Sequence, residues 1–363
     1  MKNIWKKDKG FVIFIIVAIA FPFIYSLLGQ TSLTEGTNKF WQGQLINFFI
    51  MAVFAMSYDL LFGYAGMLSF GHAASFGGGS YTVALLLTHV APDIVKNYQI
   101  FIGNFNITEI VVLIVCFLAA ILVSILIGLL FSASAMRVKG AYFAMLTLAL
   151  ATALNLLTRA TDFVEWTGAD EGMHGVPVPA WINPTQNRLT FYFIALIFLV
   201  ITYILMKRIV SSPTGRVIQA TRENEDRSRM IGYNPVTYRT LAFVMASVFA
   251  GVAGALYSLW TTSATPSMTS GVTTVNALIM TILGGMGTLI GPVLGAGIMQ
   301  IFSQFFYTWF GARWPLVFGI IFVLIVMFLP YGIVGTWRMH GFRLKEGWQR
   351  LLGMLKTKPS SEK

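Results

Sequence analysis

Two ionisable side chains lie in stretches that are otherwise apolar or glycine-rich: Asp59 near the end of the apolar run 45–62, and His72 in the stretch 63–87. Such a group at membrane depth is by default a functional hypothesis, because it can move a proton or bind a polar part of a solute. The alternative for Asp59 is that it lies about one helical turn from the cytoplasmic end of its apolar run and is simply hydrated. The alternative for His72 is a hydrogen bond to a carbonyl freed where a helix breaks.

Motifs for catalysis or cofactor binding are missing from the sequence. There is no G-x-x-x-x-G-K-[ST] phosphate-binding loop and no G-x-S-x-G nucleophile elbow. The four histidines, His72, His89, His174 and His340, are too scattered for a zinc site, and the single cysteine, Cys116, cannot form an intrachain disulfide. We therefore expect no catalytic residue, no metal and no cofactor bound by this chain.

The composition is that of a membrane protein. Of the 363 residues, 56% are hydrophobic and 11% are charged, whereas soluble chains carry about 25% charged residues. Most of the 25 basic residues fall on one side of the predicted spans, so the net charge of +11 marks orientation and the lipid-facing rim, not nucleic-acid binding. We predict an all-α polytopic membrane protein with its membrane domain over 1–335 and a basic tail over 336–363.

About ten transmembrane helices are predicted, with both termini in the cytoplasm. A span needs about 20 mostly apolar residues. Because the basic tail and the basic N-terminus should share one side, the number of crossings must be even, so the segment 273–307 is divided at 284–292. The predicted spans are 11–28, 45–62, the later part of 63–87, 110–131, 141–157, 189–206, 240–260, a short element ending near 284, 293–307 and 315–334.

Two of the predicted elements are interrupted by glycine. The pattern G-x-x-G-x-L occurs at 63–68 and again at 284–289. Paired glycine interruptions in the two halves of a bundle point to a substrate path, although a repeat of six residues could also arise by chance. The candidate path residues are Asp59, Gly66, Ser69, His72, Ser75, Gly284 and Gly287.

A polar loop over 207–239 interrupts the apolar sequence and carries seven basic residues against three acids. The positive-inside bias assigns it to the cytoplasm. Ser212-Pro213 and Asn234-Pro235 each read as a helix N-cap followed by proline, and Gly232 suits a helix stop. We predict one short helix over 213–231 that docks on a partner, because a polar helix has little core of its own to bury.

The largest predicted outer segment, 158–188, is acidic and rich in turns. Asp170, Glu171 and His174 could contact a soluble partner, and the alternative is an ordinary solvated loop. At the other end of the chain, leucines and Trp348 recur at helical spacing among basic residues over 344–356. This pattern predicts an amphipathic helix on the inner membrane surface.

Several separated stretches together resemble the membrane permeases of branched-chain amino acid ABC importers, and within that family the LivM-type subunit. The resemblance covers roughly 45–330. The stretches are GYAGMLSFGHAASFGGGSYTVALLL (63–87), RVKGAYFAMLTLAL (137–150), TGADEGMHGVP (167–177), and SPTGRVIQATRENEDRSRMIGYNPVTYRTLAFVMASVFAGVAGALY (212–257) followed by ILGGMGTLIGPVLGA (282–296).

The resemblance implies an importer in a prokaryotic cytoplasmic membrane, with a second, related permease subunit as a heterodimeric partner. Two ATP-binding subunits would bind ATP and Mg²⁺, and an extracytoplasmic binding protein would deliver the solute. The polar loop would be the coupling element that fits a groove on an ATPase. Relatives usually have two alanines where this chain has Arg227 and Ser228. The implied coupling residues are Gly215, Arg216, Arg222, Glu223, Asn224, Glu225 and Gly232.

Three other interpretations remain open at this stage. A proton-coupled secondary transporter would use Asp59 and His72 as its proton pair and would leave the polar loop without a purpose. An importer of the same architecture could carry urea, a short amide or another small polar solute, because no residue excludes it. A membrane scaffold would not need paired glycine breaks.

Overall fold

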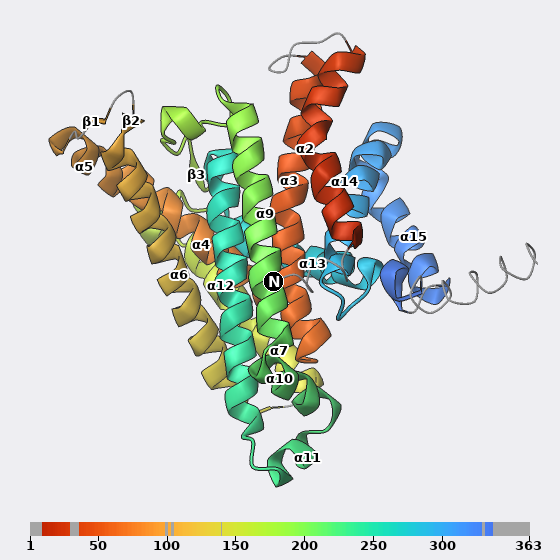
Figure 1. The fold of residues 1–363 in the computed structure, drawn as a ribbon. Coiled ribbons are helices and arrows are strands. Elements are labelled where there is room, and N and C mark those ends of the chain that lie inside the picture. Colours follow the sequence, from red (N-terminus) through yellow and green to blue (C-terminus); the bar gives the residue numbers. More distant parts are fainter. Residues whose placement is uncertain are drawn as a thin grey trace, which may run out of the picture.

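The structure is a computed structural model that describes residues 9–29, 36–98, 101–102, 105–138, 140–328 and 331–336. Nearly all of it is helical (Figure 1). The predicted amphipathic helix of the basic tail lies outside the described residues. The helices are α2 (Lys9–Gly29), α3 (Gly36–Asp59), α4 (His72–Leu85), α5 (Ala91–Asn97), α6 (Ile107–Ala135), α7 (Ala141–Arg159), α8 (Val164–Thr167), α9 (Arg188–Ser211), α10 (Pro213–Glu223), α11 (Glu225–Met230), α12 (Pro235–Thr261), α13 (Gly271–Gly284), α14 (Ile290–Phe310) and α15 (Trp314–Phe328).

Short π-helical and 3₁₀ turns and two short antiparallel strand pairs complete the described elements. The antiparallel pairs are β1 (Phe101–Ile102) with β2 (Phe105–Asn106), and β3 (Met173–His174) with β4 (Ser263–Ala264). The turns are η1 (Leu60–Tyr64) and η2 (Leu86–Val90), both π-helical, and the 3₁₀ turns η3 (Thr161–Phe163), η4 (Ala180–Ile182), η5 (Pro266–Thr269) and η6 (Gly311–Arg313).

The prediction of an all-α polytopic membrane protein is confirmed. Within the described residues, eight helices are long and apolar enough to cross a membrane. The helices α4 and α13, each of 14 residues, are shorter. Together with these two, a helix stands at each of the ten predicted elements, and the division at 284–292 coincides with the break between α13 and α14. The number of crossings stays a prediction.

One boundary of the prediction is wrong. The spans predicted from the sequence leave residues 29–44 as a polar outer loop that contains Glu35 and Lys39. In the structure α3 already begins at Gly36 and buries the amides of Asn38 and Gln42. Asn38 donates to the carbonyl of Pro22 in α2, and Gln42 donates to Asn38. Polar side chains that satisfy one another can extend a membrane helix beyond its apolar run.

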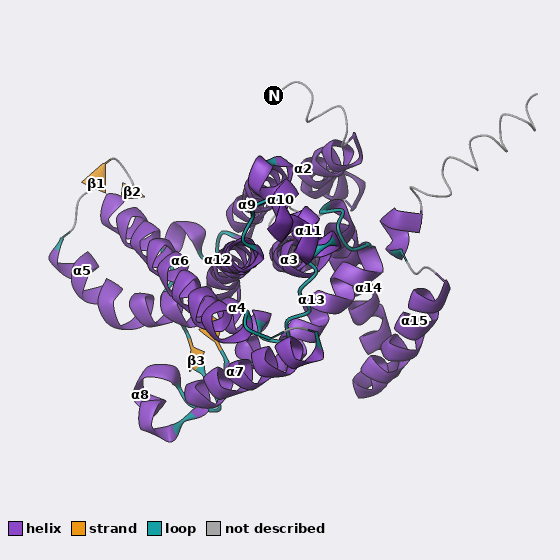
Figure 2. Cartoon of the chain, turned by 90° about the horizontal axis from the view of Figure 1, so that it is seen from below, coloured by secondary structure: helices purple, strands orange, loops and turns teal. Residues whose placement is uncertain are grey.

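The core of the bundle forms where α3, α4, α6 and α12 pack together (Figure 2). Close approach depends on glycine. A side chain on Gly79 of α4 would fall on the backbone of Gly251 in α12, and one on Gly254 would fall on the backbone of Phe76. Packing of this kind holds helices together in lipid, where water provides no drive for their association. The small residues over 250–255 therefore let α12 pack closely on α4.

The polar loop and the outer segment lie at opposite ends of the bundle. Figure 1 shows α10 and α11 at the bottom and β3, together with the β1–β2 pair, toward the top. The long helices α9 and α12 run between the two ends. Any signal between a partner on the polar loop and a partner on the outer segment must therefore pass through the bundle.

Candidate functional site

The first break in the bundle lies between α3 and α4. The helix α3 ends in the π-helical turn η1, and an irregular stretch follows until α4 starts at His72. Gly66 in this stretch has φ of +71°, a backbone conformation that side chains disfavour. Because irregular backbone is tolerated at membrane depth only where protein or water satisfies it, the partners of this stretch matter.

The second break, between α13 and α14, spans residues 285–289. Gly285 and Gly287 have φ of +116° and +74°, and Leu289 has φ of +51°. Gly284 itself ends α13 and packs so closely on Gly291 that no side chain would fit. The glycines of this repeat are therefore required by the turn and by the close approach of α13 to α14.

Asp59 joins the two breaks. Its side chain is 0% exposed, so the interpretation as a hydrated residue near a helix end is wrong. One carboxylate oxygen accepts from the backbone N–H of Gly287 at 2.6 Å, and the other accepts from Leu289 at 3.2 Å. The carboxylate thus satisfies donors that the second break would otherwise leave buried and unpaired.

Gly63 lies directly against this contact. A side chain there would overlap the Asp59 carboxylate and come too close to the backbone of Gly287. The two G-x-x-G-x-L stretches, separated by more than 200 residues in sequence, are therefore in contact with one another. Both stretches thus have the same structural role: each lets one broken helix pack closely on the other.

Arg222, at the end of α10, connects the polar loop to the same place. Its guanidinium donates to the carbonyl of Gly63, and its aliphatic part covers Gly66, where a side chain would collide with it. Hydrogen bonds from a charged donor are stronger than neutral ones. A movement of α10 would thus displace the first break and, through the bonds of Asp59, the second break.

The polar loop contains two helices, not the single helix predicted over 213–231. The chain turns at Asn224, which has extended backbone angles and whose side chain accepts from the N–H of Arg227 as the N-cap of α11. Asparagine competes for backbone hydrogen bonds and so favours caps over helix interiors. The caps predicted at Ser212 and Asn234 are confirmed, and Gly232 follows the second helix with φ of +96°.

The other predicted coupling residues differ in their surroundings. Gly215 packs against the last carbonyls of α9, where a side chain would not fit. Arg216 and Glu223 are exposed. Glu225 is not exposed in the same way, because its carboxylate pairs with Arg229 and Arg239, both at 3.1 Å. Glu225 therefore holds α11 to the start of α12, whereas Glu223 and Asp226 are the exposed acids of the loop.

Two exposed apolar residues at the tip of the loop were not among the predicted coupling residues. Met230 is 87% exposed and Ile231 is 67% exposed. Exposed apolar residues surrounded by polar ones are typical of protein interfaces. The signal was present in the sequence, since Met230 and Ile231 are neighbouring apolar residues in an otherwise polar segment.

His72 is buried at the first turn of α4 and bonds to α3. Its Nε2 lies 2.8 Å from Oγ of Ser57, and the same hydroxyl lies 2.7 Å from the carbonyl of Phe54. The ring stacks on Phe54 with centroids 5.5 Å apart. Its Nδ1 has no hydrogen-bond partner among the described residues. His72 and Asp59 thus bond to different elements, and no described hydrogen bond joins them as a proton pair.

The serines near His72 shape the same break. Ser69 accepts from the N–H of Gly71, and its carbonyl accepts from the hydroxyl of Tyr58. The N–H of Ala73 donates to Thr274 of α13, so a side chain of the neighbouring element satisfies the start of α4. Ser75 is also buried, beside Gly251. These residues are buried and fix the position of the start of α4.

We expect the variant His72→Ala to impair uptake strongly while leaving the subunit assembled. The substitution removes the bond to Ser57 and the ring that packs on Phe54, where the first break must hold its shape. Solute uptake by the reconstituted transporter, with co-purification of the partner subunits, measures both. The variant His89→Ala, at the opposite end of α4 and η2, is the control. Normal uptake by His72→Ala would contradict a role for this residue.

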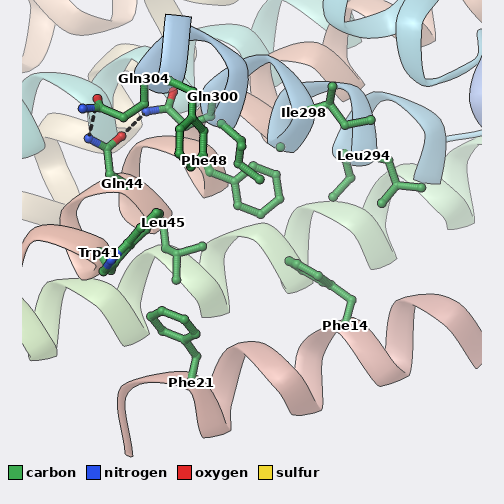
Figure 3. A pocket seen from close by; sticks show the side chains of 14 residues that line it. Phe14, Phe21, Trp41, Gln44, Leu45, Phe48, Leu294, Ile298, Gln300 and Gln304 are labelled. Carbon is green, nitrogen blue, oxygen red and sulfur yellow. Dashed lines mark hydrogen bonds between the residues drawn. The ribbon is translucent and has the colours of Figure 1, made fainter. Parts of the chain in front are cut away.

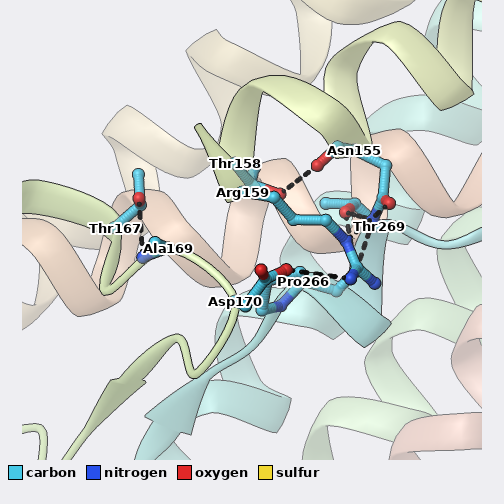
Figure 4. A network of polar contacts seen from close by, with 8 residues as sticks. All are labelled: Asn155, Thr158, Arg159, Thr167, Ala169, Asp170, Pro266 and Thr269. Atoms are coloured by element: carbon cyan, nitrogen blue, oxygen red, sulfur yellow. Dashed lines mark hydrogen bonds and ion pairs between the residues drawn. The ribbon is translucent and has the colours of Figure 1, made fainter. Parts of the chain in front are cut away.

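The outer segment is folded against the loop between α12 and α13 (Figure 4). Arg159 pairs with Asp170 at 3.0 Å and donates to Asn155, which in turn donates to the carbonyl of Pro266 and to Thr269. Asp170, Glu171 and His174 are exposed, and Nε2 of His174 lies 3.0 Å from the carbonyl of Glu171. All three residues are therefore accessible on the outer segment, and their contact with a soluble partner stays a prediction.

Three cavities accompany these elements. One of about 390 Å³ lies beside Gly66 and Arg239, at the end that carries the polar loop. Another of about 290 Å³ lies under β4, at the opposite end. A third of about 400 Å³ lies between α2, α3 and α14 and is lined almost wholly by apolar side chains such as Phe14, Phe21 and Leu294 (Figure 3).

The third cavity is closed along one side by amides. Gln44 donates to Gln304, Gln300 donates to Gln44, and Asn47 donates to Gln300. These bonds join α3 to α14, as amide side chains do across helices in lipid. An apolar groove with its amides already paired offers little to a polar solute, so the first two cavities are the better candidates for a transport path.

Comparison with known proteins gives one consistent answer. The family model described as branched-chain amino acid transport system / permease component matches residues 42–329. The chain is similar to the "High-affinity branched-chain amino acid transport system permease protein LivM" of Salmonella typhimurium, with 24% identity over 94% of this chain and 78% of the relative. No solved structure matches.

Two further relatives cover most of both chains. The "Probable branched-chain amino acid transport permease protein LivM" of Methanocaldococcus jannaschii is 24% identical over 80% of this chain and 92% of its own length. The "High-affinity branched-chain amino acid transport system permease protein LivH" of Salmonella typhimurium is 20% identical over 78% of this chain and 91% of its own length.

Proposed function

Since this chain belongs to the family of permease components of branched-chain amino acid transport systems and is of the LivM type, we propose that it carries branched-chain amino acids across a prokaryotic cytoplasmic membrane as one subunit of an ATP-driven importer. The observation that carries the proposal is the polar loop, which stands outside the bundle and bonds through Arg222 to Gly63 at the first break, while Asp59 of α3 joins that break to the second.

The importer would contain a second permease subunit, two ATP-binding subunits that hold ATP and Mg²⁺, and an extracytoplasmic binding protein. Similarity to both LivM and LivH proteins supports a heterodimeric permease pair. The polar loop would lie in the cytoplasm with both termini, after ten crossings, as the positive-inside bias suggests. The surface of Asp170, Glu171 and His174 would then face the binding protein.

ATP hydrolysis in this scheme drives the bundle between two states mechanically. A ligand or partner can shift such an equilibrium only by binding the two states differently. The exposed tip of the loop, Met230 and Ile231, would supply the contact with an ATPase subunit, and Arg222 would pass its movement to the breaks. The two polar cavities at opposite ends would open alternately.

Reconstitution with the partner subunits tests the proposal. The complex should form, and ATP should be hydrolysed in response to the binding protein, only with a native loop. We expect Met230→Glu or Glu223→Lys to lower co-purification of the ATPase and the stimulated hydrolysis about tenfold, because interface anchors typically contribute more than about 1 kcal/mol each. The exchange Glu171→Lys, on the opposite end, is the control for assembly with the ATPase. Solute uptake driven by a proton gradient by this chain alone would overturn the proposal.

A further inference from the structure

The cavity under β4 combines an apolar wall with unpaired polar groups. Phe54, Phe76 and Tyr257 form an aromatic row, with ring centroids 4.5 Å apart between the first two and 5.5 Å between the last two. Met51 and Met280 extend this wall. An apolar group of a solute placed here would leave water and gain free energy in proportion to its buried area.

Most of the remaining lining consists of hydroxyl and amide side chains. Thr265 and Ser267 bond to each other at 2.7 Å, and Thr273 donates to the carbonyl of Ser267. By contrast, the Asn276 amide and the Tyr257 hydroxyl have no hydrogen-bond partner within the described part of the chain. These two groups can form hydrogen bonds to a solute without first breaking a bond within the protein. A bound solute that offered them no partner would leave them unsatisfied, which costs free energy.

No charged residue belongs to the described lining of this cavity. A solute with a net charge would therefore lose its hydration without gaining a counter-ion. A zwitterion with no net charge can use hydroxyl and amide partners, and Thr273 places the first turn of α13 beside the cavity, where a carboxylate is favoured. A volume of about 290 Å³ is at the small end of ligand sites, which begin near ~300 Å³.

The roof of the cavity is held by the outer segment. The strand β4 pairs with β3, so that His174 opposes Ser263, and the N–H of Val176 donates to the carbonyl of Thr262. The Arg159–Asp170 pair reaches η5 through Asn155 (Figure 4). A protein that contacts the outer segment would therefore touch the element that covers the cavity.

We propose that the cavity between Tyr257 and Asn276 is the outer solute site of this permease and takes a small amino acid with an apolar side chain and no net charge. The inference rests on the proposed function. The aromatic row receives the side chain, while Asn276, Tyr257 and the hydroxyls bind the carboxylate and amino groups. His72 lies behind this site, because Phe54 separates its ring from the cavity.

Variants of the two unpaired groups test the site in the complete importer in proteoliposomes. We expect Asn276→Leu, which keeps the approximate shape and removes the amide, to lower uptake of radiolabelled leucine about tenfold and to raise the ATP consumed per leucine. Tyr257→Phe should act in the same direction, while the matched control Tyr142→Phe, exposed on α7, should not. Unchanged uptake and ATP consumption in both cavity variants would overturn the proposal.

A labelling experiment tests the site even if the cavity variants misfold. In a Cys116→Ser background, the variant Met51→Cys, which lines the cavity and keeps Asn276 and Tyr257 in place, should react with a membrane-impermeant maleimide from outside, and leucine with binding protein should slow the reaction at least about threefold. Protection by urea and not by leucine would overturn the assigned ligand class. If the unaltered complex takes up no solute with ATP, the proposed function itself fails, which differs from a loss confined to the cavity variants.

Discussion

Replacing Arg222 by alanine is expected to lower ATP-driven uptake about tenfold while the ATPase subunits still co-purify with the permease. The reason is that the Arg222 side chain is the described contact from α10 to both Gly63 and Gly66. A hydrogen bond with a charged partner contributes roughly 1.5–3 kcal/mol, and we take the lower value because Arg222 is exposed to solvent. About 1.4 kcal/mol corresponds to tenfold. Uptake and ATP hydrolysis by reconstituted complexes measure the effect.

Two variants sharpen this test. Arg222→Lys keeps the charge but loses the planar fork of donors, so we expect an intermediate loss. Arg208→Ala removes an exposed arginine from the end of α9 and should be silent. Uptake at the normal level with Arg222→Ala would contradict the role of this contact between α10 and the first break in transport. Loss of co-purification would instead make Arg222 a docking residue.

Local features of the fold could be predicted from the sequence, since they depend on residues close together in the chain. Ser212 and Asn234 are N-caps followed by proline, and the glycines near 287 end a helix. The single helix over 213–231 was the local error. The start signal at Ser212-Pro213 and the stop at Gly232 marked the two ends, and one asparagine cap between them divides the segment.

Contacts between distant residues could not be predicted. Nothing near Asp59 in the sequence indicates that its carboxylate meets Gly287, and nothing near Arg222 points to Gly63. The repeated G-x-x-G-x-L pattern pointed to both breaks but not to their contact. The cavity under β4 was also missed, because its lining comes from α3, α4, α12 and α13 and contains no ionisable residue that would attract attention.

Removal of the Asp59 carboxylate should have the largest effect on stability. Asp59→Ala leaves the N–H groups of Gly287 and Leu289 without their acceptor in a buried setting, and each unsatisfied group costs about 1–3 kcal/mol. We expect destabilisation of roughly 2–6 kcal/mol by the same principle, seen as a lower midpoint of thermal unfolding in detergent. Asp226→Ala, an exposed acid on α11, should leave the midpoint nearly unchanged.

The variant Asp59→Asn separates a structural carboxylate from a proton-carrying one. Its shape is retained, but only the amide oxygen can accept, so one of the two backbone N–H groups faces an N–H donor. If Asp59 holds the two breaks together, Asp59→Asn should be less stable than the native protein and more stable than Asp59→Ala, and uptake should fall in the same order. If Asp59 carries protons, Asp59→Asn should keep full stability and lose transport completely. That outcome would show that the buried carboxylate takes part in transport. It would contradict the structural role that its bonds to Gly287 and Leu289 indicate.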